Sequence, residues 1–129
     1  MFVRFVTALQ DPESRSFTGL FVHVYEALES SRLMPHEEEL LRERLDWFKM
    51  HLKVPACLSE NGNERAICWF KPEAHRPLDY AWDMIAVLRE HGLHIEMIKT
   101  KDPGTILYED GWQVVAKPHR NNRLRGRRP

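Results

Sequence analysis

The chain has 129 residues, of which 43% are hydrophobic and 29% are charged, with 19 basic and 19 acidic side chains. This length suits one domain that buries about two-thirds of its unfolded surface, and the composition is ordinary for a globular protein. No apolar run reaches the roughly 20 residues of a membrane-spanning helix, and the apolar start is too short for a signal peptide, so we expect a cytoplasmic protein without a membrane partner.

The N-terminal half predicts one strand and two helices. Residues 2–6 form a short apolar run, typical of a strand that is buried on both faces. Apolar residues then recur at helical spacing over residues 18–30. Pro35 suits the first turn of a second helix, where its missing N–H has no partner to lose, and Pro55 closes that helix.

The C-terminal half predicts a strand, a helix and three further strands. Residues 66–70 are nearly continuously apolar, and a third helix starts at Pro77, or less favourably at Pro72, and ends at Gly92. Apolar residues then alternate in three runs within residues 93–117. The runs are separated by two sets of turn-forming residues, which are Asp102, Pro103 and Gly104, and then Asp110 and Gly111.

Together these elements predict a single α+β domain over residues 1–118. We expect a two-layer sandwich, in which three helices pack on a mixed five-stranded sheet with the order β-α-α-β-α-β-β-β. The strands on either side of the third helix should be parallel, joined by a right-handed crossover. The last three strands should form an antiparallel meander.

A basic tail follows the predicted domain over residues 119–129, and we expect it to be disordered. It holds five of the 19 basic residues and no acid, so the rest of the chain has 14 basic and 19 acidic residues, a net charge of −5. Two interpretations stay open, a solubilising terminus and an arm for nucleic acid or an acidic protein. The residues of the arm would be Arg120, Arg123, Arg125, Arg127 and Arg128.

The sequence gives little support for a metal or a cofactor. Cys57 and Cys68 are interpreted as small, partly buried hydrophobic residues, with a disulfide or redox pair as the alternative. Neither has neighbours at the spacing of zinc ligands. The run from His36 to Glu39 lacks a second histidine four residues on, so we interpret its carboxylates as helix-end electrostatics. We therefore expect no metal and no cofactor.

A lysine-rich edge of the sheet is the main candidate site. If the strands that flank the third helix are parallel, the basic residues that follow the strands collect at one edge, beside the N-terminus of that helix. We expect this edge to bind an anion, either a phosphate-bearing molecule or a nucleic-acid backbone, and the alternative is a set of solvated strand-end charges. The lysines are Lys71, Lys99, Lys101 and Lys117.

The opposite edge is predicted to carry Arg65, Glu109 and Asp110. Paired carboxylates can perform acid–base chemistry, but adjacent residues on a strand point to opposite faces. Asp110 and Gly111 also have a sufficient role as a hairpin turn. We therefore assign this edge a structural role.

Three functions fit these features. The first is a non-catalytic binding or regulatory module whose lysine-rich edge and arginine tail contact an anionic partner, and we favour it. The second is a small enzyme for a phosphorylated or nucleotide substrate, in which Lys71 and Lys99 clamp the anion and His75 is the candidate acid or base. The third is a structural protein that forms a homodimer through an unpaired sheet edge.

Two segments, residues 65–71 and 103–116, resemble a group of small bacterial proteins that are described only as hypothetical. The likeness covers most of residues 1–118 and does not include the tail. It implies a bacterial-type cytoplasmic protein. It brings no activity, cofactor or catalytic residue with it.

Overall fold

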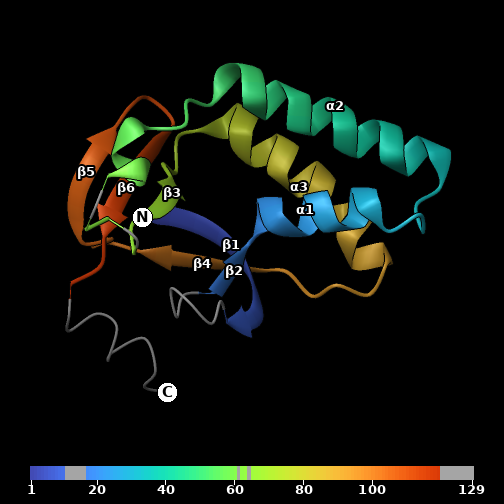
Figure 1. Ribbon diagram of the computed structural model, residues 1–129, viewed down its shortest axis with the longest axis horizontal. Coiled ribbons are helices and arrows are strands. Elements are labelled where there is room, and N and C mark those ends of the chain that lie inside the picture. Colours follow the sequence, from blue (N-terminus) through green and yellow to red (C-terminus); the bar gives the residue numbers. More distant parts are fainter. Residues whose placement is uncertain (11–16, 61, 64, 120–129) are drawn as a thin grey trace. The chain divides into compact units, whose positions relative to one another are not determined.

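A computed structural model gives the fold, and it describes residues 1–10, 17–60, 62–63 and 65–119 (Figure 1). The five arginines of the predicted arm therefore lie outside the described residues. Within the described residues, the helices are α1 (Leu20–Glu29), α2 (Pro35–His51) and α3 (His75–Glu90), with a 3₁₀ helix at Ala56–Ser59. The strands are β1 (Phe2–Gln10), β2 (Phe17–Gly19), β3 (Ile67–Phe70), β4 (Glu96–Thr100), β5 (Thr105–Glu109) and β6 (Gln113–Lys117).

The predicted α+β class and the order β-α-α-β-α-β-β-β are confirmed. The structure adds β2 and the 3₁₀ helix to that order. The third helix begins at His75, so Pro77 lies in its first turn, where a backbone N–H has no partner within the helix in any case. No helix of the described part of the chain combines the length and the hydropathy that crossing a membrane requires.

The sheet pairs its strands differently from the expected meander. Its order is β2-β1-β3-β6-β5, and β4 pairs with β1 outside this path. The pairs β1–β2, β1–β3, β3–β6 and β5–β6 are antiparallel. β4 and β5 are consecutive in the chain but are not neighbours in the sheet, so the turn between them is not a hairpin.

Side-chain hydrogen bonds explain how the chain leaves β4 without forming a hairpin. The hydroxyl of Thr100 accepts from the N–H of Asp102 at 3.2 Å and donates to its carbonyl at 3.1 Å. The carboxylate of Asp102 then accepts from the N–H of Gly104 at 3.1 Å. These local bonds satisfy backbone groups that a strand ladder would otherwise use. Pro103, between them, has no N–H to donate.

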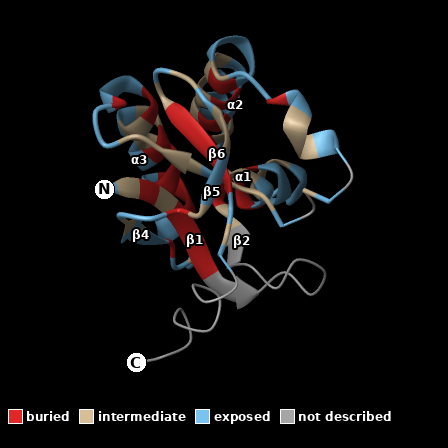
Figure 2. Cartoon of the chain, turned by 90° about the vertical axis from the view of Figure 1, so that its left-hand side faces the viewer, coloured by how far each residue is buried: buried red, intermediate tan, exposed pale blue. Residues whose placement is uncertain are grey.

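Contacts within the chain define two compact units, which we describe separately. The sheet unit comprises residues 1–4, 54–74 and 99–129, and the helical unit comprises residues 5–53 and 75–98. In the sheet unit β6 lies between β3 and β5. It is the most buried strand of this unit, as its red colour in Figure 2 shows. Residues 113–116 of β6 are all buried, so this strand is covered on both faces and its burial does not follow the alternation that the sequence predicts.

The helical unit is held together by an apolar core and by polar contacts between its helices. The rings of Phe21 on α1 and Phe48 on α2 meet edge to face, with centroids 5.1 Å apart. Arg44 on α2 donates from Nε to Asp83 on α3 at 2.9 Å. The buried core residues are Phe5, Val6, Leu20, Val24, Leu41, Leu45, Phe48, Ala81, Met84, Ile85, Val87, Leu88 and Ile95.

The end of α1 contains a strained residue that offers a stability test. Ser31 has φ 61°, a left-handed conformation that costs a residue with a Cβ roughly 1–2 kcal/mol and that glycine adopts without strain. Glycine also increases the entropy of the unfolded chain, which offsets part of this gain. We expect Ser31→Gly to raise the free energy of unfolding by about 0.5 kcal/mol in urea denaturation. A loss of stability would show that the Ser31 conformation carries no strain.

Candidate anion-binding site

Lys71 lies at the end of the sheet unit where the β5–β6 hairpin turns. Phe70 pairs with Gln113, and the N–H of Lys71 donates to the carbonyl of Trp112 at 2.8 Å. Lys71 Nζ forms an ion pair of 2.6 Å with Glu109 Oε2, and the Lys71 side chain is only 16% exposed. Its charge is therefore already compensated by a carboxylate, and an anion would have to displace Glu109 to reach it.

The other end of the same strands carries Lys117. Lys117 pairs with Thr105, and the neighbouring residue Ala116 pairs with Ile67. Arg65, two residues before Ile67, therefore lies at this end of the strands. The turn that precedes Thr105 lies there too, with Lys101 in it and Lys99 just before it.

We call the group of Arg65, Lys99, Lys101 and Lys117 the cationic end. All four residues are exposed. None of them forms an ion pair or hydrogen bond from its side chain with another described residue. Their charges are thus available to a partner, in contrast to the charge of Lys71.

The expectation that Lys71 lies with the other three lysines is therefore wrong. It assumed that β3 and β4 are parallel and that β4 and β5 form a hairpin, which together would make β6 parallel to β3. In the structure β3 and β6 are antiparallel, so the residues that follow these two strands lie at opposite ends. Five residues at about 3.3 Å each separate the two ends by about 17 Å. The same pairing moves Arg65 from its expected place beside Glu109 to the cationic end.

The turn of the cationic end also contacts the start of the tail. His119 Nε2 lies 3.2 Å from Asp102 Oδ1, with both side chains about half exposed. Gly104 packs so closely on Lys117 and Pro118 that an added Cβ would lie 2.1 Å from the carbonyl oxygen of Lys117. The chain therefore reaches the cationic end immediately before residues 120–129.

The opposite end of the strands is built around Asp110, which has the structural role predicted for it. Its Oδ1 accepts from the N–H groups of Trp112 and Gln113 at 2.9 and 3.0 Å. Its Oδ2 accepts from the Tyr108 hydroxyl at 2.8 Å and from the Gln113 amide at 3.2 Å. Burial alone would raise the pKa of Asp110, but these four donors together hold that pKa below its usual value. The Asp110 carboxylate thus caps the hairpin.

A second carboxylate with a lowered pKa joins two helices of the helical unit. Glu37 Oε1 accepts from the N–H of Met34 at 2.8 Å and lies 3.0 Å from Nε2 of His91. The backbone hydrogen bond from Met34, followed by that from His91, lowers the pKa of Glu37. Its place at the start of α2 agrees with the helix-end role that the sequence indicates.

The remaining candidates from the sequence are dispersed. His75 is exposed as the first residue of α3. Cys57 is half-buried and Cys68 is exposed, and both are unpaired thiols. The described residues contain no group of three or more histidine, cysteine, aspartate or glutamate side chains that could hold a metal ion.

Comparison of the chain with models of protein families, with curated proteins and with solved structures finds no match. The resemblance of residues 65–71 and 103–116 to small bacterial proteins therefore stays a prediction. Any function has to be argued from the geometry of the chain itself.

Proposed function

We propose that the chain is a small binding module that contacts the phosphate backbone of a nucleic acid through the cationic end and the arginine tail. One observation carries this proposal. The contact between His119 and Asp102 brings the start of the tail to the turn that holds Lys101. Up to nine cations, four at the cationic end and five in the tail, can therefore act on one polyanion.

The side chains favour phosphate contacts without base recognition. Lysine and arginine side chains at an exposed strand end can neutralise phosphates and release their counterions, which gives binding that does not depend on sequence. The acidic body of the chain would repel a polyanion elsewhere on its surface, since residues 1–118 have a net charge of −5. The cationic end and tail are thus the part of the chain suited to such a partner.

The test compares the full chain with a chain that ends at His119, using fluorescence anisotropy with a labelled duplex DNA and a labelled single-stranded RNA. Binding should weaken as salt rises, with a slope of about −0.9 on a log–log plot for each duplex phosphate that is neutralised. Truncation should weaken binding at least about tenfold in low salt and make the slope shallower. The double variant Lys101→Gln, Lys117→Gln should weaken binding in the same direction.

Lys71→Gln is the control, because it removes one lysine charge from the other end of the same strands. It should leave both the affinity and the salt slope unchanged. The proposal is wrong if neither nucleic acid shows salt-dependent binding to the full chain. It is also wrong if Lys71→Gln weakens binding as much as the double variant does, since the effect would then depend on total charge and not on the cationic end.

A further inference from the structure

A groove between α1 and α2, within the helical unit, is lined by four charged side chains, two leucines and a tyrosine. Its volume is about 230 Å³. This is below the roughly 300–1,000 Å³ of pockets for drug-sized ligands, so the groove suits a smaller ligand. Its lining residues are Tyr25, Leu28 and Glu29 from α1, and Arg42, Leu45, Asp46 and Lys49 from α2.

The floor and the rim of this groove differ in polarity. Leu45 is buried and Leu28 is half-buried, so aliphatic side chains form the apolar part. Tyr25 is 44% exposed and adds an aromatic ring to the lining. The charged residues Glu29, Asp46 and Lys49 are all exposed beside them.

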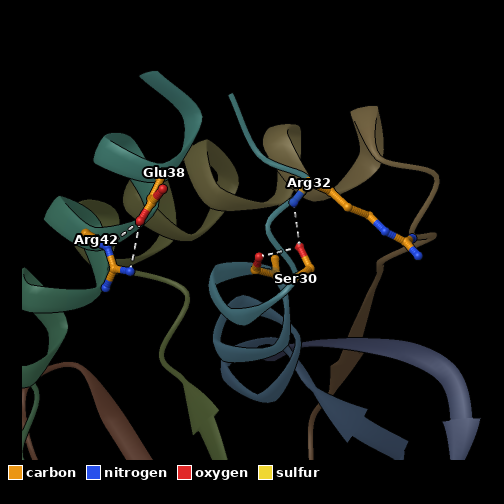
Figure 3. Close-up of polar contacts among 5 residues, drawn as sticks. Ser30, Arg32, Glu38 and Arg42 are labelled. Atoms are coloured by element: carbon orange, nitrogen blue, oxygen red, sulfur yellow. Dashed lines mark hydrogen bonds and ion pairs between the residues drawn. The ribbon is translucent and has the colours of Figure 1, made fainter. Parts of the chain in front are cut away.

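Three charges at the rim lack the ion pairs that most neighbouring charges have. The carboxylates of Glu29 and Asp46 form no hydrogen bond or ion pair with another residue in the described part of the chain. Lys49 Nζ lies 5.4 Å from the centroid of the Tyr25 ring and has no carboxylate partner among those residues. Arg42, by contrast, donates from Nε and Nη2 to Glu38 at 3.1 and 2.9 Å (Figure 3).

We infer that this groove binds a small zwitterion, an α-amino acid with an apolar side chain. The ammonium group would lie by Glu29 and Asp46, and the carboxylate by Lys49. The aliphatic side chain would lie on the two leucines of the floor. A ligand with only a positive charge would face Lys49, and one with only a negative charge would face two carboxylates, so a zwitterion satisfies the rim best.

L-Leucine is the probe, and chemical shifts of the full chain in a ¹H–¹⁵N NMR titration are the measurement. A ligand of this size is expected to bind with a Kd of about 1 mM. Saturable shifts should therefore appear at the groove residues below about 20 mM leucine. 3-Methylbutylamine, which lacks the carboxylate, and 4-methylpentanoate, which lacks the ammonium group, should each bind at least about tenfold more weakly.

Variants test the contact of the ligand's ammonium group and the contact of its carboxylate one at a time. Asp46→Asn and Lys49→Gln should each raise the Kd for leucine about fivefold to tenfold. Two controls remove a charge of each sign outside the groove. Glu39→Gln changes an exposed residue of α2, and Arg32→Gln changes a side chain that extends away from the Glu38–Arg42 pair (Figure 3). Both controls should bind leucine as the unaltered chain does.

Three results would overturn the inference. The first is the absence of saturable shifts at the groove residues. The second is equal binding of leucine and 3-methylbutylamine, which would indicate a cation site. The third is a Kd for leucine in Asp46→Asn and Lys49→Gln that equals the Kd of the two controls. Because the probe is not a polyanion, none of these results bears on the proposed nucleic-acid contact.

Discussion

Replacing Gly104 with alanine is expected to destabilise the protein by at least about 3 kcal/mol. Gly104 has φ +117°, a conformation that residues with a Cβ rarely adopt. An added Cβ would lie 2.1 Å from the carbonyl oxygen of Lys117 and 2.9 Å from Cα of Pro118. Both neighbours are backbone atoms, so no side chain can rotate away, and β6 itself would have to move.

Urea denaturation gives the free energy of unfolding, and thermal denaturation should show a fall in Tm of about 10 °C or more. Two other glycines distinguish the cost of the positive φ from the cost of the close packing. Gly62 has φ +90° but open space around it, so Gly62→Ala should show only the conformational cost, about 1 kcal/mol. Gly111 has open space and no positive φ, so Gly111→Ala should be nearly neutral. If Gly104→Ala costs no more than Gly62→Ala, the packing of the turn on Lys117 is not as tight as described.

This turn also determines where the cationic end lies, because Gly104 holds residues 101–104 against the end of β6. The Gly104→Ala variant should therefore lose nucleic-acid affinity as well as stability, if the proposed function is right. The Lys101→Gln, Lys117→Gln variant changes only exposed side chains and should lose affinity alone. That difference distinguishes a residue that positions the site from residues that contact the partner.

The helices could be predicted from the sequence because their signals are local. Leu41, Leu45 and Phe48 follow the spacing of one helix face, and all three are buried in α2. Pro35 begins α2, as its missing N–H favours. The strand β2 was not predicted, because three residues are too few to show an alternating pattern.

Strand pairing could not be predicted in the same way. A sequence of aspartate, proline and glycine indicates a change of direction, but it does not say whether the strands on either side pair with each other. In the structure the side chains of Thr100 and Asp102 bond the turn to itself, and β4 pairs with β1. That choice depends on residues distant in the chain, so periodicity carries no information about it.

The same difference between local and distant signals applies to the basic residues of the candidate site. Lys101 and Lys117 lie at the same end of the strands, because the turn that holds Lys101 packs on Lys117. The expected places of Lys71 beside these lysines and of Arg65 beside Glu109 are both wrong, because both required the direction of β3 relative to β6. Charge and turn signals are thus sufficient to find basic residues at strand ends. Only the antiparallel pairing of β3 with β6 assigns each of these residues to one of the two ends.

The second large effect is expected at the opposite end of the same strands, where Asp110→Ala should destabilise the protein by about 3 kcal/mol. The substitution removes an acceptor of four hydrogen bonds, from Tyr108, Trp112 and twice from Gln113. Gln113 as a residue is only 2% exposed, so water cannot easily replace the lost carboxylate. Asp110→Asn should cost less than Asp110→Ala, because its carbonyl oxygen can still accept from the two backbone N–H groups.

The same carboxylate should make stability depend on pH in the acid range. The folded protein favours ionised Asp110, since its pKa lies below the ordinary value of 3.8. The stabilisation is therefore present above that ordinary value and is lost as pH falls through the pKa of the folded protein. Urea denaturation between about pH 6 and pH 2.5 should show a shallower loss of stability for Asp110→Asn than for the unaltered chain.

Glu73→Gln is the matched control, because Glu73 is an exposed carboxylate of the sheet unit without a hydrogen bond or ion pair to the described residues. It should leave both the stability at neutral pH and its dependence on acid unchanged. Glu37 also has a lowered pKa, so the unaltered chain and both amide variants should lose further stability in acid through that group. The contribution of Asp110 is thus the difference between Asp110→Asn and Glu73→Gln in the stability lost as pH falls. If Asp110→Asn and Glu73→Gln lose stability in parallel as pH falls, then the ionised carboxylate does not hold the hairpin.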